Sequence, residues 1–442
     1  MSGPARTAEQ RELRELRDAV RAVLDRHPGH AAWAPLTAQV GAAALAVPQE
    51  YGGLGCGAAE VGVVMAELGR ALSPVPYLGS AVLAVQALLA AGDRQACARH
   101  LPGLAEGAVV GALAWAEGPA GSTAGRPGPC SVAGSGPAPG GAPEAAPAAA
   151  SGPGAEAAPD AGPDAGPGGG PGAAPGAGPD PCGVHPGAGR GGWEAADTAT
   201  RAVPDGEGWL LTGTKRYVLA GPAEPGLVLV FAVIAADPAT ASAPGQGIGT
   251  GRLGLFELTA PPAAFTVRST LDRTRPLAEL ILDRTPARLL SPDGAAVLAR
   301  VRDLACTALA AEQVGAAARA LEVTVRYAKD RTQFGRPIGS FQAVKHRLAD
   351  MHTAVETAGA LALAAAAADA PPRLAAAAKS ACSQTYAYVA GEMIQLHGGI
   401  GITWEHPAHE FFKRAHGSAL LFGTPAAHRA RLAADLGFGG AL

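Results

Sequence analysis

Hydrophobic residues at the start of the chain recur every three or four positions, which is the spacing of an amphipathic helix. Between Glu9 and Asp25 this apolar face consists of Leu13, Leu16, Val20, Val23 and Leu24. Similar patterns predict further helices over 36–45, 59–72 and 80–91. Together these segments predict an N-terminal helical domain that covers residues 1–107.

Beyond residue 107 the pattern changes to short runs of branched and aromatic residues between Gly and Pro clusters, which is typical of strands. The predicted strands lie over 109–118, 209–219, 227–235, 252–258, 265–269 and 278–283. They predict a small antiparallel β domain over 108–291. A Pro/Gly/Ala-rich insert, about 119–191, separates its first two predicted strands. This insert has almost no large apolar side chains to offset the entropy of ordering, so we expect it to be disordered.

From residue 292 onward the helical spacing returns, in long segments with short connections. The apolar stripes comprise Val314, Ala318, Leu321, Val325 and Ala328, then Phe341, Val344, Leu348, Met351 and Val355, then Tyr386, Val389, Met393 and Leu396. This pattern predicts an up-down four-helix bundle over 292–442. The expected fold class is therefore α+β and multidomain, with the order helical, β, helical.

Charge and cysteine usage exclude several functions. The net charge of -3 over 442 residues gives no basic footprint for nucleic acid. No apolar run reaches the ~20 residues of a membrane span, and the N-terminus has no apolar signal core, so we expect a cytoplasmic protein. Six cysteines contain no CxxC pair, and His397, His406 and His409 lack metal-ligand spacing, so no metal site is predicted.

Two glycine-containing motifs in the bundle could bind phosphate. The first reads RTQFG (331–335) and continues to SFQ (340–342); the second reads QLHGGIG (395–401). On pattern alone, a helix end with a basic residue and a glycine turn would explain both. Read over their full length, however, they resemble the two C-terminal signatures of the acyl-CoA dehydrogenase family. The stretch HGGIGITWEHPAH (397–409) is similar to a bacterial subgroup of that family, several members of which are hetero-oligomers acting on bulky acyl-CoA substrates.

The resemblance implies FAD as the cofactor. In the family the arginine of the first motif meets the FAD pyrophosphate of a neighbouring subunit, and a planar guanidinium suits two phosphate oxygens. The second motif touches the adenosine end. The implied contacts in this chain are Arg331, Gln333, Phe334, Gln342, Gln395, Gly398 and Gly399.

Two motifs of the β domain resemble the segments that hold the flavin ring. They read AWAEGPAGS (114–122) and LTGTKRYVL (211–219). The implied ring contacts are Ala116, Ser122, Tyr217, Leu219 and, late in the chain, Thr424. Three of them depart from the family: Ala116 replaces a threonine, Tyr217 the stacking tryptophan, and Leu219 the threonine near flavin N5. The hydrogen bonds that tune the ring are therefore in question.

The usual catalytic base is missing. Family members with a late base read EGTSxxxR, where this chain has Phe422. The alternative position, on the first bundle helix, is Ala305. Asp303 lies about 200° round that helix from Ala305, whereas Glu312 shares its face about 10 Å along the axis. Both are weak candidates for the base, and Glu312 is the slightly better one.

The resemblance thus predicts an FAD-dependent acyl-CoA dehydrogenase that desaturates the α,β bond of an acyl thioester. Its expected partners are an acyl-CoA or related thioester, electron-transfer flavoprotein or another acceptor, and further subunits of a homo- or hetero-oligomeric dimer or tetramer. One alternative is a non-catalytic subunit that completes the FAD site of a partner. Another is a flavin enzyme with different chemistry on a carrier-bound acyl group.

Overall fold

The computed structural model describes residues 3–117, 193–194, 197–221, 224–235 and 251–438. The predicted insert, together with Ser122, lies outside the described residues. None of the helices in the described part is long and apolar enough to cross a membrane.

The N-terminal helices bury the apolar faces that the sequence predicts. They are α1 (Gly3–Arg26), α2 (Trp33–Val40), α3 (Ala58–Arg70), α4 (Val85–Ala91) and α5 (Arg94–Ala105). The predicted 36–45 helix ends early because Gly41 adopts φ 70°, and a 3-10 turn follows. The predicted 80–91 helix begins as a π-helical segment, Leu78–Ala84. The sequence pattern did not predict α5, whose N-cap is Asp93.

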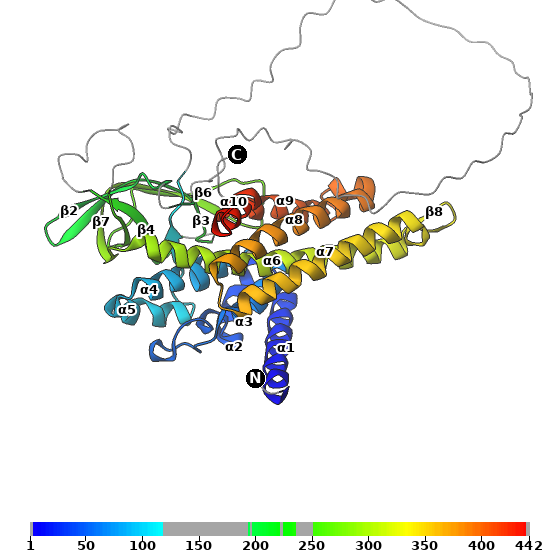
Figure 1. Cartoon of the computed structure of the whole chain (residues 1–442), viewed down its shortest axis with the longest axis horizontal. Helices are drawn as coiled ribbons and strands as arrows, with labels where there is room; N and C mark the ends of the chain where they lie inside the picture. The colour runs from blue at the N-terminus through cyan, green and yellow to red at the C-terminus, as the bar shows by residue number, and fades with distance from the viewer. Residues whose placement is uncertain (1–2, 118–192, 195–196, 222–223, 236–250, 439–442) are drawn as a thin grey trace, which may run out of the picture. The chain divides into compact units, whose positions relative to one another are not determined.

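Within the described residues, seven strands form one sheet (Figure 1). They are β1 (Gly111–Ala114), β2 (Arg201–Asp205), β3 (Gly208–Val218), β4 (Leu227–Ile234), β5 (Leu253–Leu258), β6 (Ala264–Arg268) and β7 (Leu277–Ser291). The order is β1-β4-β2-β3-β7-β5, β6 pairs with β7, and β4 also pairs with β5. The sequence had not predicted β2.

The prediction of a wholly antiparallel sheet is wrong. β4 pairs in parallel with β1, from Gly111 opposite Leu227, and in parallel with β2. The remaining pairs are antiparallel. β1 and β2 both lie beside β4 rather than beside each other, so the two strands that flank the insert are not partners.

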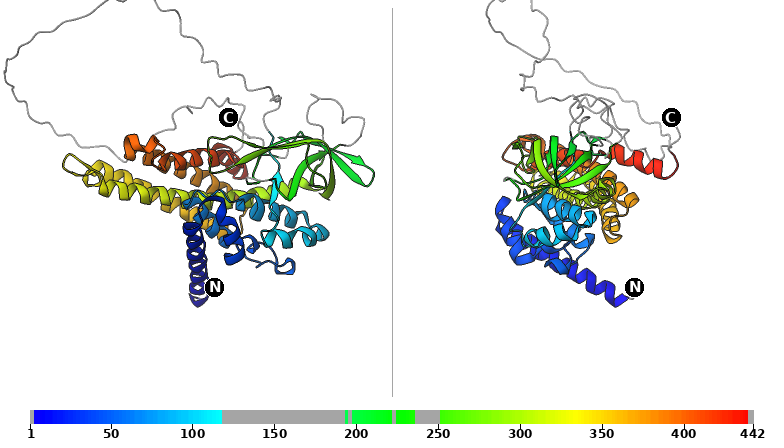
Figure 2. Two further views of the ribbon diagram at one scale, coloured as in Figure 1. Left: turned by 180° about the vertical axis from the view of Figure 1, so that it is seen from behind. Right: turned by 90° about the vertical axis from the view of Figure 1, so that its left-hand side faces the viewer.

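The C-terminal helices are built around α6 (Gly294–Asp330). It packs against α3, α7 (Gln342–Ala367) and α8 (Pro372–His397), and the chain ends in α9 (Ala408–Leu420) and α10 (Pro425–Asp435). Figure 2 shows α6 lying between the N-terminal helices and α8. A small hairpin of β8 (Thr332–Gln333) and β9 (Arg336–Pro337) forms the corner between α6 and α7.

Candidate functional site

The α6–α7 corner displays the first motif on the surface. Phe334 and Gly335 have positive φ, 53° and 75°, and the Phe334 side chain is 91 % exposed. Arg331 and Gln333 are exposed beside it, and the side-chain amide of Gln333 donates to the carbonyl of Thr332 at 2.8 Å. Gln342, at the start of α7, hydrogen-bonds His346 at 2.8 Å and is also exposed. The corner therefore offers a guanidinium, amides and an aromatic ring to solvent.

The second motif lies next to this corner. Tyr327, one helical turn before Arg331, stacks on His397 with ring centroids 4.3 Å apart. His397 ends α8, and its Nδ1 donates to the carbonyl of Met393 at 2.7 Å. Burial lowers the pKa of His397, so its ring is held neutral within the stack. The structure thus brings the two signature motifs together at one end of α6.

The glycine turn after His397 leaves room for a ligand. Gly398 has φ 60°, and a Cβ added at Gly398 or Gly399 would meet nothing within 4 Å. Gln395 is exposed beside them. Main-chain N–H groups that a ligand can approach closely suit phosphate or ribose oxygens. We call the surface formed by Arg331, Gln333, Gln395, Gly398 and Gly399 the dinucleotide face.

Aromatic side chains gather beside the predicted ring positions of the β domain. Trp115, Trp193 and Phe422 meet edge to face, with centroids 5.2 to 5.3 Å apart. Tyr217 has φ 58°, is half-exposed, and lies 6.1 Å from Trp193. Ala116 and Leu219 are buried next to this cluster, and their side chains carry no hydrogen-bonding group. Trp193, which the sequence did not single out, packs against Trp115, Tyr217 and Phe422, and we call these four aromatic residues the ring seat.

A buried ion pair fixes the strands that carry these positions. The Glu117 carboxylate accepts hydrogen bonds from the backbone N–H groups of Ala199 and Thr200, at 2.7 and 2.9 Å, and from Lys215 Nζ at 2.5 Å. Burial alone would raise the pKa of Glu117, but Lys215 and the Thr200 bonds lower it overall. We call this arrangement the Glu117 clasp.

The two family positions for the base are buried and apolar. Phe422 has φ 62° and is 1 % exposed, and Ala305 is fully buried on α6. Thr424, two residues later, uses its hydroxyl to cap α10 by accepting from Ala427 N. The position of the missing glutamate thus holds an aromatic side chain in a packed environment.

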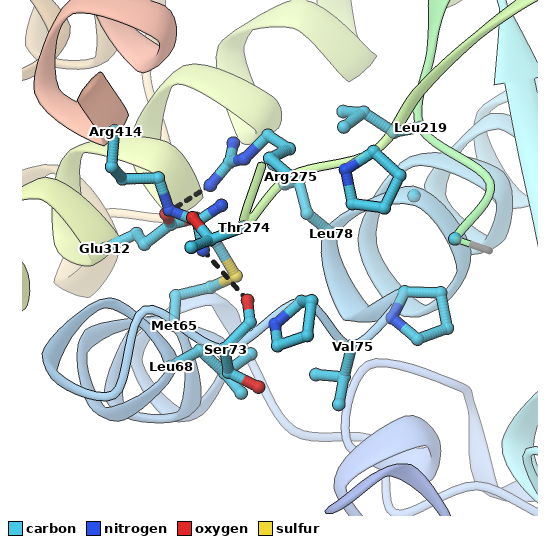
Figure 3. Close-up of a pocket in the computed structure, with 15 residues that line it drawn as sticks. Met65, Leu68, Ser73, Val75, Leu78, Leu219, Thr274, Arg275, Glu312 and Arg414 are labelled. Carbon is cyan, nitrogen blue, oxygen red and sulfur yellow. Dashed lines mark hydrogen bonds and ion pairs between the residues drawn. The ribbon is translucent and has the colours of Figure 1, made fainter. Parts of the chain in front are cut away.

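Both weak candidates for the base are engaged by arginine. Asp303 lies 2.8 Å from Arg431 Nη2. Glu312 is paired with Arg275, and Arg414 Nε lies 3.2 Å from the same Glu312 oxygen. Figure 3 shows Arg275 and Arg414 converging on the Glu312 carboxylate. Both carboxylates are thus occupied by ion pairs within the described structure.

Comparison with known proteins identifies the family. The model of the acyl-CoA dehydrogenase N-terminal domain matches residues 7–108, and that of the C-terminal domain matches residues 293–437. Acyl-CoA dehydrogenase IpdE2 of Mycobacterium tuberculosis is 34% identical over 433 residues, covering 94% of each chain. The chain belongs to the acyl-CoA dehydrogenase family. IpdE2 of Mycolicibacterium smegmatis is 31% identical over 97% of this chain and 99% of its own.

The fold agrees with this acyl-CoA dehydrogenase assignment. A variant of the Tcur3481-Tcur3483 steroid ACAD superposes with a TM-score of 0.69 at 26% identity, covering 97% of this chain and 99% of its own. The protein is thus a flavin-dependent oxidoreductase of the type that acts on CH–CH groups.

Proposed function

We propose that this protein takes part in the FAD-dependent α,β-dehydrogenation of an acyl-CoA thioester as one subunit of a hetero-oligomer. The predicted FAD contacts form two groups, one near Phe422 and the other around Arg331. The proposal rests on the distance between these two groups. Cys306 marks the point of α6 that is next to Phe422, because its Sγ lies 4.0 Å from the Phe422 carbonyl oxygen. Arg331 follows 25 residues later, which corresponds to roughly 37 Å along the helix. One dinucleotide cannot contact both ends within a single chain, so the dinucleotide face completes a site on a neighbouring subunit.

The residues of the dinucleotide face fit the phosphate end of FAD. Within the described residues, the Arg331 guanidinium makes no hydrogen bond or ion pair, and the Gly398–Gly399 backbone faces open space. A planar guanidinium beside open N–H groups matches a pyrophosphate. FAD, when bound, supplies the hydride-accepting flavin ring of the reaction. In this chain Arg331, Gln333 and Gln395 would bind and orient its phosphate and adenosine parts.

The surface next to the dinucleotide face suits a subunit contact. Ile402 and Trp404 follow the glycine turn and are mostly exposed, and Phe412 and Leu420 of the following helix α9 are also exposed. Large exposed apolar patches mark interaction surfaces. We infer that a second subunit covers this surface. The flavin ring of one FAD would then lie in the second subunit, and its phosphates would contact the dinucleotide face of this chain.

The candidate carboxylates of this chain do not provide a free catalytic base. Phe422 and Ala305 carry none, and Asp303 and Glu312 are held by arginines. We infer that a family member that retains the glutamate supplies the base in the assembly. The similarity to a steroid ACAD that is named for two components, Tcur3481 and Tcur3483, supports a paired enzyme with a bulky acyl substrate. Electron-transfer flavoprotein is the acceptor that fits this reaction.

The test is anaerobic flavin bleaching by a panel of acyl-CoA thioesters. The chain is assayed alone and after co-purification with a glutamate-bearing family member encoded beside it. We expect slow or absent bleaching by the chain alone and rapid bleaching by the complex, because losing a general base costs on the order of 10²- to 10⁴-fold. Rapid bleaching by the unpartnered chain would contradict the partner's role, and Glu312→Gln and Asp303→Asn would then locate the base. Absence of flavin from both preparations would contradict the proposed function itself.

A further inference from the structure

A small cavity lies under Leu219, away from the dinucleotide face. Its volume is about 30 Å³, enough for one or two water molecules or one small functional group. Its walls come from α3, the segment 73–79, the loop 274–276, α6 and α9. The lining is largely apolar, with Met65, Leu68, Val75, Leu78 and Leu219 on its walls (Figure 3). One wall is charged and contains Arg275, Glu312 and Arg414.

The charges at this wall are balanced. Arg275 donates to Glu312, and Arg414 Nε lies 3.2 Å from the same Glu312 oxygen. Arg414 also lies 3.5 Å from Asp272, so two guanidiniums face two carboxylates. Arg414 Nη2 donates to the main-chain carbonyl of Ser73 at 2.8 Å. Addition of an unpaired anion would disturb this balance in a buried site, which is costly.

Among the described residues, three donors of the lining have no hydrogen-bond partner: Nη1 of Arg275, the hydroxyl of Ser73, and Nε of Arg414, which still lies 3.2 Å from a Glu312 oxygen as an ion pair. Arg275 and Ser73, which have no such second contact at these atoms, are 8 % and 7 % exposed. A buried donor that has no acceptor loses its hydration without compensation, so such groups are rare in native structures. Their presence at one small cavity indicates that an acceptor is supplied from outside the chain.

We infer that this cavity is a subsite for a carbonyl oxygen carried by an otherwise apolar acyl group. A carbonyl oxygen accepts hydrogen bonds and adds no charge, which suits both the unpaired donors and the balanced ion pairs. The apolar walls suit the carbon atoms that are bonded directly to the carbonyl group. The inference deepens the proposed function, because it names the class of acyl group, a ketone-bearing one, and therefore rests on binding of acyl-CoA.

The experiment compares matched thioesters by isothermal titration calorimetry. Each set holds a methyl ketone, the methyl-branched alkane of the same shape, and a dicarboxylic monothioester: for example 5-oxohexanoyl-CoA, 5-methylhexanoyl-CoA and glutaryl-CoA. Neighbouring chain lengths are included, since the ketone must reach the cavity. They are titrated into the purified protein and into its complex with the partner. We expect the ketone to bind about 3- to 10-fold more tightly than the branched analogue in one set, the range for one to two hydrogen bonds.

Two variants isolate the unpaired donors. Ser73→Ala removes the hydroxyl, and Arg275→Lys keeps the charge beside Glu312 but removes Nη1. Both should reduce the preference for the ketone to about 1- to 2-fold. Ser80→Ala is the matched control, because Ser80 is buried nearby but its hydroxyl already accepts from Gly111 N at 2.9 Å. Ser80→Ala should lower the melting temperature and keep the preference, whereas Ser73→Ala should leave the melting temperature unchanged.

The remaining outcomes contradict the inference in separate ways. Equal affinity for ketone and branched analogue at every length means that the cavity holds a resident water only. Tightest binding of the dicarboxylic compounds means that it takes an anion. Binding of no thioester at all, by the chain or the complex, overturns both this inference and the proposed substrate. Rapid flavin bleaching by thioesters that show no preference for the ketone overturns this inference but leaves the proposed function standing.

Discussion

His428 Nε2–H donates a hydrogen bond to the main-chain carbonyl of Phe422, with 3.0 Å between the atoms. The bond lies directly under the side chain that replaces the family's glutamate. Phe422 has a left-handed backbone conformation, and its ring packs against both Trp115 and Trp193. His428 Nδ1 is buried without a partner in the described structure. The residue at the family's base position is thus fixed in place by a hydrogen bond of its backbone, but its side chain cannot accept a proton.

The burial of His428 makes stability depend on pH. Burial and nearby Lys379 lower the pKa of His428 to about 4, so the folded protein keeps the ring neutral. The unfolded chain binds more protons between pH 6.5 and 4, and stability is therefore present above pH 6.5 and lost as the pH falls toward 4. The loss should be about 3 kcal/mol. Urea unfolding at several pH values should show it, and His428→Gln should remove that part of the slope. An equal slope in wild type and variant would refute this assignment.

Arg331 should control cofactor retention in the assembly. Arg331→Ala removes a charge-assisted contact to phosphate and should weaken FAD binding by roughly 1.5 to 3 kcal/mol. Flavin absorbance after dialysis measures the loss. The control is Arg373→Ala, which deletes another exposed guanidinium that donates to the Asp435 carbonyl. If both variants keep flavin as well as the wild type does, Arg331 has no role in binding it.

The Glu312 pairing should contribute strongly to folding. Glu312→Gln leaves Arg275 and Arg414 without their shared carboxylate and should cost about 3 to 5 kcal/mol of unfolding free energy. Glu322 is a control on the same helix, because it pairs with Arg70 at 2.8 Å near the surface. Glu322→Gln should cost about 1 kcal/mol or less. Similar denaturation midpoints for the two variants would show that the buried pairing adds little.

The 119–191 insert should be dispensable for folding. The Glu117 clasp holds residues 199 and 200 against residue 117, so a short connection can replace the chain between them. Replacement of 119–190 by about ten Gly and Ser residues should raise stability by at most about 2 kcal/mol, since loop entropy changes slowly with length. Thermal unfolding and flavin content report the outcome. A shortened protein that is insoluble or loses flavin would show that the insert is needed.

Much of the fold could be predicted because its signals are local. The apolar stripes of α7 and α8 follow the helical period over many turns, and β4 is a continuous apolar run. β2 was missed because its five residues, RAVPD, include a proline and a terminal aspartate. The parallel pairing of β1 with β4 has no local signal, because the partners are more than 100 residues apart in sequence.

The residues of the candidate site could be predicted only where they belong to a recognisable sequence motif. Arg331 and Gln395 stand in long signatures, and the structure places their segments together through Tyr327 and His397. The arginines that pair with Glu312 come from a β-domain loop and from α9, far from it in sequence. Trp193 follows a low-complexity segment, so no periodicity marks it as a residue of the ring seat. Such long-range contacts appear only once the chain is folded.

The position of β1 also affects how the protein unfolds. β1 follows α5 directly, and a Cβ at Gly111 would stand 2.6 Å from the Ala84 side chain and 3.1 Å from that of Leu104. The same strand supplies four residues to the edge of β4. Separation of the N-terminal helices from the sheet would therefore break main-chain hydrogen bonds and tight packing at once. The helical and β regions should melt in a single cooperative transition rather than as independent folding units.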